Sequence, residues 1–274
     1  MEKHLHPTPT LLENTGHWKH RIVIGHAMTG SVRVEWMMGR MGQTIPCNWG
    51  HLDIMQFMSP FCPLKYQIAD AENLIAKAVV ESDAEWYLSW EHDNIPPNDA
   101  LVKLNQYMLD CDVPVVSGVY FTKSVPSEPL VYRGLGNSYF QDWRLGDKVW
   151  VSGVPFGFTL IHGNIIREMW RDSPEYMVSG QVTRRVFEAP QKSWSDPSIG
   201  AYYTYGGTSD LAWCDRVVKE GYLAKAGFPK IQKMKYPFLV DTSIFVRHID
   251  PSGTQYPLSV PSRFQPNGKP REIK

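Results

Sequence analysis

Two acidic side chains, Glu91 and Asp93, lie two residues apart where an apolar run of the sequence ends. Residues 85–90 (EWYLSW) have the aromatic and apolar character of a buried strand, and residues 95–97 (IPP) break the chain soon afterwards. Carboxylates at a strand tip can be aimed together at one hard cation. Ligands of open α/β sheets also bind at the carboxyl ends of strands. We therefore interpret Glu91 and Asp93 as contacts for a metal or nucleotide, with a solvated acidic turn as the simpler alternative.

A second candidate is His248, in the run VRHID that follows the segment carrying Asp241. A single histidine is more often structural than a metal ligand. If the strands lie side by side, however, His248 would complete a set of oxygen and nitrogen ligands with Asp93. Such a mixed set suits Mn²⁺, and Mg²⁺ is an alternative.

The third candidate is Asp210, in residues 206–216 (GGTSDLAWCDR). Two glycines and a capping residue precede a helical pattern, so Asp210 falls in the first turn of a helix. Its carboxylate could simply complement the helix dipole. It could also serve as a general base or a clamp for an acceptor hydroxyl.

The elements that must position these residues alternate along the first part of the chain. Apolar runs predict strands, and periodic stripes or caps predict helices. Such alternation predicts an α/β fold with a mostly parallel central sheet flanked by helices. The strands are expected at residues 21–26, 85–90 and 113–120, and the helices at residues 64–81 and 99–110.

The pattern changes after residue 121, where short hairpin-like strands predict a smaller antiparallel part. A strand at 154–161 contains Gly157, a helix is expected at 208–220, and a strand pair at 238–250. Residues 172–205 look irregular and suggest a functional loop or lid. Its aromatic residues could close over a ligand: Trp194, Tyr202, Tyr203 and Tyr205.

Composition argues against several classes of protein. The chain has 28 basic and 28 acidic residues, so it lacks the basic excess of a typical nucleic-acid binder. None of its four cysteines has CxxC spacing, and the polar start has no signal-peptide core. No apolar run is long enough to span a bilayer. We expect a cytoplasmic, soluble protein without stable membrane insertion, in which residues 1–19 form a flexible arm and 251–274 a tail.

The order of these motifs resembles that of the GT-A glycosyltransferases, in particular the family-2-like group. The resemblance covers about residues 20–250, in one domain with a nucleotide-binding half (20–120) and an acceptor half (121–250). The acid-x-acid motif of that family stands here as Glu91-His92-Asp93, and its acidic pair as Ser209-Asp210. The matching stretches are RIVIGHAMTG, YLSWEHDNIPP, SGVPFGFTLI, TSDLAWCDR and VDTSIFVRHID.

The resemblance implies a metal-dependent transfer of a sugar from a UDP- or GDP-sugar to an acceptor hydroxyl. Asp93 and His248, with Glu91 directly or through water or ribose, would hold Mn²⁺ or Mg²⁺ on the diphosphate. A divalent cation there would stabilise the negative charge of the leaving group.

The resemblance also implies roles on either side of the metal. The loop from His26 to Thr29 would contact the nucleotide, and Asp210 would deprotonate or orient the acceptor. Gly157 would allow the sugar to approach the backbone closely, or else mark a strand bulge.

Other functions remain open on the sequence alone. A nucleotidyltransferase uses a related sheet, but the loop GHAMTGSVR lacks the basic, glycine-rich character of those enzymes. A non-catalytic protein that binds nucleotide sugars or carbohydrates would not need Asp210. The acceptor could be a saccharide, a small molecule or, less in keeping with zero net charge, a modified DNA base.

Overall fold

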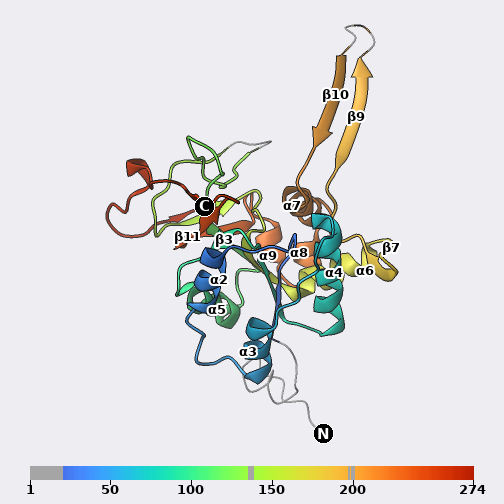
Figure 1. Ribbon diagram of the computed structural model, residues 1–274, viewed down its shortest axis with the longest axis horizontal. Coiled ribbons are helices and arrows are strands. Elements are labelled where there is room, and N and C mark those ends of the chain that lie inside the picture. Colours follow the sequence, from blue (N-terminus) through green and yellow to red (C-terminus); the bar gives the residue numbers. More distant parts are fainter. Residues whose placement is uncertain (1–20, 135–138, 197, 199–200) are drawn as a thin grey trace.

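A seven-stranded sheet forms the centre of the computed structural model, which describes residues 21–134, 139–196, 198 and 201–274 (Figure 1). The predicted α/β architecture is confirmed, but the sheet is mixed: β1, β2, β4 and β11 run in one direction, and β6, β5 and β14 in the other. In spatial order the strands are β1 (Ile22–Gly25), β2 (Trp86–Trp90), β6 (Phe158–His162), β4 (Val115–Val119), β11 (Phe238–Phe245), β5 (Lys148–Val151) and β14 (Glu272–Ile273).

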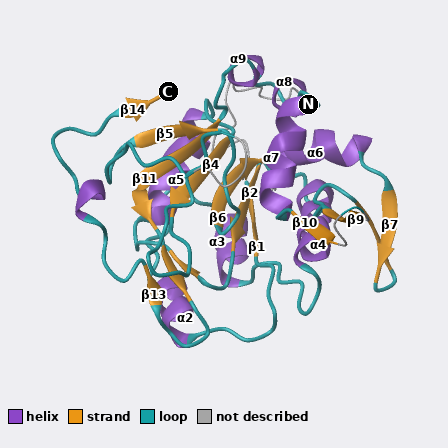
Figure 2. Ribbon diagram, turned by 90° about the horizontal axis from the view of Figure 1, so that it is seen from above, coloured by secondary structure: helices purple, strands orange, loops and turns teal. Residues whose placement is uncertain are grey.

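Helices cover both faces of this sheet (Figure 2). One apolar cluster joins the sheet to α4, α6 and α7, and the other joins its opposite face to α3 and α5. Burial on both faces explains why the inner strands are continuous apolar runs instead of alternating ones. The helices are α2 (Val34–Met41), α3 (His51–Met58), α4 (Ile68–Glu81), α5 (Ala100–Asp110), α6 (Gly163–Asp172), α7 (Ser209–Lys219), α8 (Tyr222–Lys225) and α9 (Pro229–Gln232).

The segment 172–205 is not irregular, contrary to the prediction. It forms two antiparallel hairpins, β7 (Glu175–Val178) with β8 (Gln181–Arg184), and β9 (Gln191–Asp196) with β10 (Ala201–Gly206). The second hairpin projects from the body of the protein (Figure 1). The side chains of Trp194, Tyr202, Tyr203 and Tyr205 lie outside the described part, so the predicted closure by these aromatics stays a prediction.

The end of the chain packs against the body of the protein. Strand β14 pairs with the edge strand β5, and the ring of Phe264 is fully buried and stacks on Trp143 at a centroid distance of 4.2 Å. The segment 251–274 thus extends the sheet by one strand. The predicted arm, residues 1–19, lies outside the described residues. Among the described helices, none combines the length and apolar character needed to cross a bilayer.

Candidate functional site

A small three-stranded sheet beside the tip of β2 brings Asp93 next to His248. It consists of β3 (Asn94–Ile95), β12 (Arg247–Ile249) and β13 (Gln255–Tyr256), with His248 in register with Asn94. The amide of Ile249 donates to the carbonyl of Asp93 at 2.7 Å. As a result, Nε2 of His248 lies 3.4 Å from Oδ2 of Asp93, although the two residues are far apart in the sequence.

The hydrogen bonds around His248 present an acceptor to Asp93. Its Nδ1 lies 2.8 Å from the carbonyl oxygen of Phe121, and this contact is a hydrogen bond when Nδ1 carries the proton. The lone pair of Nε2 then faces the Asp93 carboxylate. Two hydrogen-bond acceptors so close to each other require a proton or a cation between them. In metal-binding histidines, the ring nitrogen that does not bind the metal usually donates to a backbone carbonyl or a carboxylate, as Nδ1 would here. The pair therefore fits a divalent cation.

A positive side chain already lies at this carboxylate, because Nζ of Lys123 contacts Oδ2 of Asp93. Burial disfavours the charged carboxylate, but hydrogen bonds and charge, from His248 when its ring is protonated and from Lys123, outweigh it and hold the pKa of Asp93 well below its usual value. Asp93 is thus a carboxylate anion that can bind a cation. Lys123 would offer a second positive group to any anionic ligand bound there.

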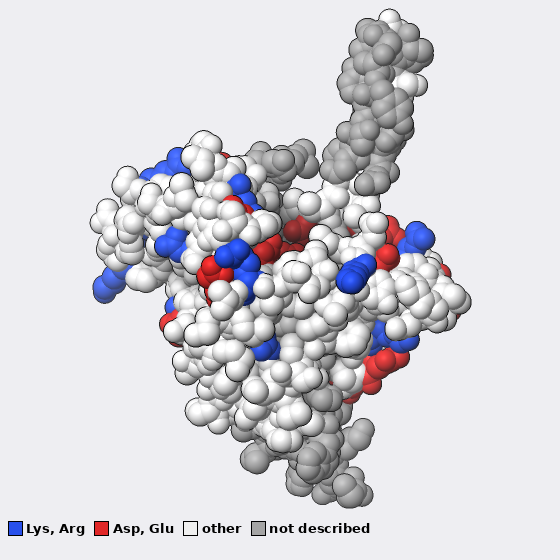
Figure 3. Space-filling model, in the orientation of Figure 1, with Lys and Arg blue, Asp and Glu red and all other residues white. Residues whose placement is uncertain are grey.

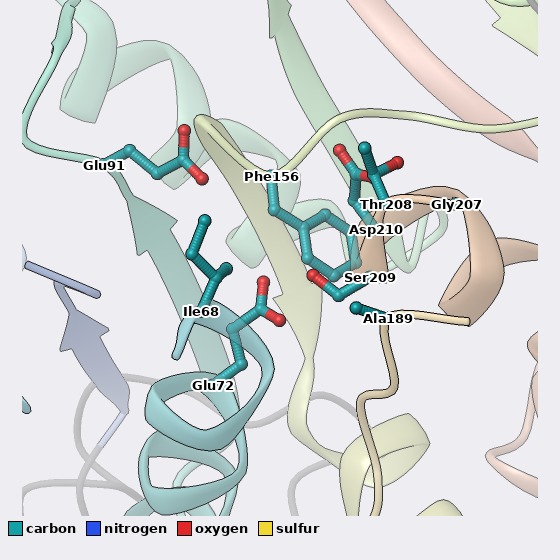
Figure 4. A pocket seen from close by; sticks show the side chains of 9 residues that line it. All are labelled: Ile68, Glu72, Glu91, Phe156, Ala189, Gly207, Thr208, Ser209 and Asp210. Atoms are coloured by element: carbon teal, nitrogen blue, oxygen red, sulfur yellow. The ribbon is translucent and has the colours of Figure 1, made fainter. Parts of the chain in front are cut away.

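Glu91 lines a neighbouring cavity (Figure 4), and Nδ2 of Asn94, which donates to Oδ1 of Asp93 at 2.8 Å, lies 3.5 Å from Oε2 of Glu91. The ligand atoms of Glu91, Asp93 and His248 do not all lie within 4.8 Å of one another. Among the described residues, only a different set of potential ligands lies within this limit. Burial, followed by the charges of Asp93 and Asp210, raises the pKa of Glu91 to about 8. The structure therefore joins two of the three predicted metal ligands and leaves Glu91 outside the direct set.

The cavity beside the pair has a volume of about 280 Å³, and its lining includes Ala189 and Gly207, which flank the β9–β10 hairpin in the chain. Figure 3 shows acidic atoms at the bottom of a hollow in this region. Its acidic residues come from three elements: α4, the tip of β2 and the first turn of α7. The lining consists of Ile68, Glu72, Glu91, Phe156, Ala189, Gly207, Thr208, Ser209 and Asp210.

The surroundings of Asp210 are compatible with both roles that the sequence left open. It lies in the first turn of α7, where a carboxylate complements the helix dipole, and its Oδ1 accepts from the amide of Leu211 at 2.7 Å. It also lines the cavity. Burial raises the pKa of Asp210, although hydrogen bonds from Thr208 and from the backbone oppose the change. A carboxylate whose pKa is raised toward neutrality is suited to accept a proton.

Glu72 is the acidic residue of this site that was not among the predicted ligands. It lies in α4, is only 3% exposed, and its carboxyl group interacts with the hydroxyl of Ser209. Burial raises its pKa well above the ordinary carboxyl value, and the charges of Asp210 and Glu91 add to this. The sequence does carry a signal: Glu72 is four residues after Ile68 and three before Ile75, on the apolar side of the helix.

The buried carboxyl group of Glu72 makes stability depend on pH. Because its folded-state pKa is raised, Glu72 stabilises the fold below the ordinary pKa, and this contribution is lost as pH rises through the raised value. Glutamine imitates the neutral form. We expect Glu72→Gln to melt a few degrees above the wild type at alkaline pH and level with it in mild acid, since each kcal/mol shifts Tm by about 2–4 °C.

Thermal melts from about pH 5 to pH 9, followed by circular dichroism, would measure this difference. Glu81→Gln is the matched control, because Glu81 belongs to the same helix and its side chain is 65% exposed. A Tm difference between Glu72→Gln and wild type that does not change with pH would contradict the burial of an ionisable group at this position.

The structure does not support a direct contact between His26 and a nucleotide. The ring is fully buried against Trp36 and Trp90, and its two nitrogens are bonded to the carbonyl of Trp90 and to Nε of Arg40. Burial lowers the pKa of His26 to about 3, so the ring also carries no charge that could attract phosphate. Thr29, by contrast, is exposed, and its hydroxyl lies 3.3 Å from Nε2 of His92 at the tip of β2.

Gly157 permits a close approach, but of the protein's own side chains. A Cβ atom at this position would lie 2.5 Å from the hydroxyl of Tyr120 and 2.6 Å from Nδ2 of Asn94. The amide of Gly157 donates to the same tyrosine hydroxyl, and its carbonyl accepts from the amide of Glu91. The predicted approach of a sugar is therefore wrong on this side of the glycine, which instead fixes the turn that carries Glu91.

A separate set of potential ligands lies at the opposite end of β2. Single ligand atoms of Glu85, Cys111 and His162 all lie within 4.8 Å of one another, next to the start of the strand. Nδ1 of His162 accepts from the amide of Asn164 at 3.2 Å and so caps α6. This capping role explains His162 without a metal, and the set contains none of the predicted ligands.

Comparison with known proteins does not assign a family. No protein-family model matches the chain, and no curated protein matches it. Among solved structures, A197 from STIV is similar, with a TM-score of 0.48 and 14% identity over 92% of this chain and 97% of that chain. A similarity of this size does not decide between the functions considered above.

Proposed function

We propose that this protein is a metal-dependent glycosyltransferase with a GT-A-like fold, which transfers a sugar from a UDP- or GDP-sugar to an acceptor hydroxyl. The observation that carries the proposal is the juxtaposition of Asp93 and His248, 3.4 Å apart, at the edge of an acidic cavity. Further support comes from the sheet, because Asp93 follows the carboxyl end of β2, which is parallel to β1 and to β4.

In this proposal the groups around Asp93 receive the diphosphate. Asp93 and His248 would hold Mn²⁺ or Mg²⁺, which when bound would act as a Lewis acid on the phosphate oxygens. Lys123 is close enough to turn from Asp93 to a phosphate, and the exposed hydroxyl of Thr29 lies at the same strand tip. These residues would bind the leaving group and stabilise its growing negative charge.

The neighbouring cavity would then hold the reacting sugar and the acceptor hydroxyl. Asp210 lines this cavity and would orient that hydroxyl and accept its proton. Ile68, whose side chain is exposed, offers apolar surface to a sugar ring. Glu91 would act on bound groups from the cavity side instead of as a direct metal ligand.

A donor panel tests the proposal. Purified protein would be incubated with UDP- and GDP-sugars in the presence of Mn²⁺, Mg²⁺ or a chelator, and the release of nucleoside diphosphate would be followed. We expect release from at least one donor, stopped by the chelator. No release from any donor under any metal would overturn the proposal. Release of pyrophosphate from a nucleoside triphosphate and a sugar phosphate would indicate a nucleotidyltransferase instead.

Removing the imidazole should weaken metal binding specifically. We expect His248→Ala to raise the dissociation constant for Mn²⁺ by at least about 10-fold, because one of two direct ligands is lost. Titration of Mn²⁺ followed by electron paramagnetic resonance measures the constant. His51→Ala is the control, since His51 is exposed at the start of α3. Equal Mn²⁺ affinity in wild type and His248→Ala would remove His248 from the metal site.

A cytoplasmic location is part of the proposal. Its support is that Cys47, Cys62, Cys111 and Cys214 are all free thiols, as is usual in a reducing compartment.

A further inference from the structure

We infer that the acidic cavity binds a positively charged amino group, so that one of the two substrates, the transferred sugar or the acceptor, carries an amine. The inference rests on the proposed function, because it takes this cavity to be the sugar- and acceptor-binding part of the transferase site. It adds the chemical class of the group bound there, which neither the metal pair nor the motif order specifies.

The first support is the charge of the lining. Glu72, Glu91 and Asp210 all face the cavity, and the described residues that line it include no lysine, arginine or histidine. Lys123 is paired with Asp93 and does not belong to the lining. Three carboxyl groups without a basic partner offer no positive charge to a phosphate. Burial favours their neutral forms in the empty cavity, but a bound cation favours the charged forms and is attracted by them. The diphosphate must therefore stay at the Asp93 side, which leaves the cavity for an uncharged or cationic part of a substrate.

The spacing of these carboxyl groups argues for an organic cation over a metal ion. In the part of the chain that the structure describes, oxygens of Glu72, Glu91 and Asp210 do not come together within 4.8 Å of one another. They surround a volume of about 280 Å³, near the lower end of the roughly 300–1,000 Å³ usual for small-molecule sites. The space thus suits a group of several atoms, such as one substituted ring.

The second, independent support is an unsatisfied buried atom. The Glu72 side chain is only 3% exposed, and its Oε2 has no hydrogen-bond partner among the described residues. In Figure 4 this carboxyl group points toward the cavity, between Ile68 and Ser209. Leaving a buried acceptor without a donor is unfavourable, which makes it a place where a ligand donor would be gained. An ammonium group offers only donors, whereas a hydroxyl group also brings an acceptor that would meet further carboxyl oxygens.

The remaining walls suit the carbon skeleton of such a ligand. Ile68 and Ala189 are exposed and contribute apolar surface, whereas the ring of Phe156 packs in the core behind them against Phe187 and Trp213. Aromatic and aliphatic walls with a few convergent polar groups are typical of small-molecule sites. A ring with one amino substituent could place its C–H surface on Ile68 and its nitrogen among the carboxyl groups.

Binding of three related sugars tests the inference. Glucosamine, glucose and N-acetylglucosamine share one ring and differ at one substituent, which is cationic only in glucosamine. Each would be titrated into the full chain near pH 6.5 by calorimetry, with chelator and without nucleotide. We expect glucosamine to bind at least about 10-fold more tightly than the other two. Glu72→Gln should reduce this preference to less than about 2-fold, and the surface control Glu81→Gln should retain it.

The outcomes separate this inference from the proposed function. Equal affinities for glucosamine and glucose, no detectable binding of glucosamine, or an unchanged preference in Glu72→Gln would each overturn the amine site. Because these titrations contain neither metal nor donor, their result does not depend on transferase activity. Donor turnover with Mn²⁺ but no preference for glucosamine would contradict only the amine inference. A preference for glucosamine without turnover of any donor would contradict only the transferase proposal.

Discussion

Donor turnover is expected to fall by about 10²–10³-fold when Asp93 is replaced by asparagine. The carboxylate lies between His248 and Lys123, and it is the anion that would hold the metal against the diphosphate. Asparagine keeps the size and the hydrogen-bonding oxygen but removes the charge, so the metal and with it much of the stabilisation of the leaving group would be lost. The measurement is nucleoside diphosphate release at saturating donor, with Mn²⁺ affinity determined in parallel.

Asp99→Asn is a suitable control for this experiment. Asp99 precedes α5, its side chain is 56% exposed, and it forms an ion pair with Lys103 on the surface. Exposed ion pairs of this kind contribute little to stability, so both activity and Tm should be close to wild type. Full activity of Asp93→Asn, with a normal requirement for metal, would mean that the diphosphate is bound elsewhere.

Asp210→Asn is the second large expected effect, a decrease in kcat of about 10²–10⁴-fold with little change in the KM for the donor. The role proposed for Asp210 is acceptance of a proton from the acceptor hydroxyl, which asparagine cannot do, and general-base catalysis contributes a factor of this size. Donor binding depends on other residues, so the KM for the donor should change little. Steady-state kinetics with an acceptor found in the donor panel would separate kcat from KM.

The pH dependence of the rate distinguishes a catalytic role of Asp210 from a purely structural one. Burial raises the pKa of Asp210, and the base works only when deprotonated, so the wild-type rate should fall as pH drops through a value above the ordinary one. The residual activity of Asp210→Asn should lack this acidic limb. Asp215→Asn, in the same helix but 60% exposed and paired with Lys219, is the control. An unchanged kcat in Asp210→Asn would leave the aspartate as a residue that only supports α7.

Local patterns predicted the helices and strands of the first half well, because the interactions that select them are short in range. The apolar stripe of α4 repeats every three to four residues, and the turn after β2 is marked by the proline pair at 96–97. The order in which the strands pair within the sheet was harder to predict from the sequence. The antiparallel insertion of β6 between β2 and β4 depends on partners far apart in the chain, which residue periodicity does not encode.

The hairpins between residues 175 and 206 show a second limit. The strands of the first hairpin, β7 and β8, are short, polar and mostly exposed, so they lack the apolar alternation by which a strand is identified. The turn at Ser179 and Gly180 has positive φ at both residues, as a two-residue hairpin turn requires, but the pair is a weak sequence signal. An irregular loop was therefore the wrong interpretation of this segment.

Within the candidate site, the acidic tip of β2 was predictable and the surroundings of each side chain were not. His26 follows β1 as expected, yet α2 folds over it and places Trp36 and Arg40 against its ring. Gly157 lies in the strand region expected, but Tyr120 and Asn94 fill the space beside it. In both cases the deciding contacts come from residues distant in sequence, whereas a motif describes only neighbours along the chain.

The position of β11 has a consequence for biosynthesis. This strand lies between β4 and β5 in the sheet, but its residues, 238–245, follow both of those strands in the sequence. A nascent chain that has already produced β1, β2, β4 and β6 still leaves the edge of β4 open, and His248 has not yet been synthesised. Open strand edges invite association with other chains, and long-range strand pairing is slow. The emerging polypeptide should therefore be prone to aggregation until residues 238–245 have left the ribosome, and the pair of Asp93 and His248 cannot bind a metal before His248 has done so.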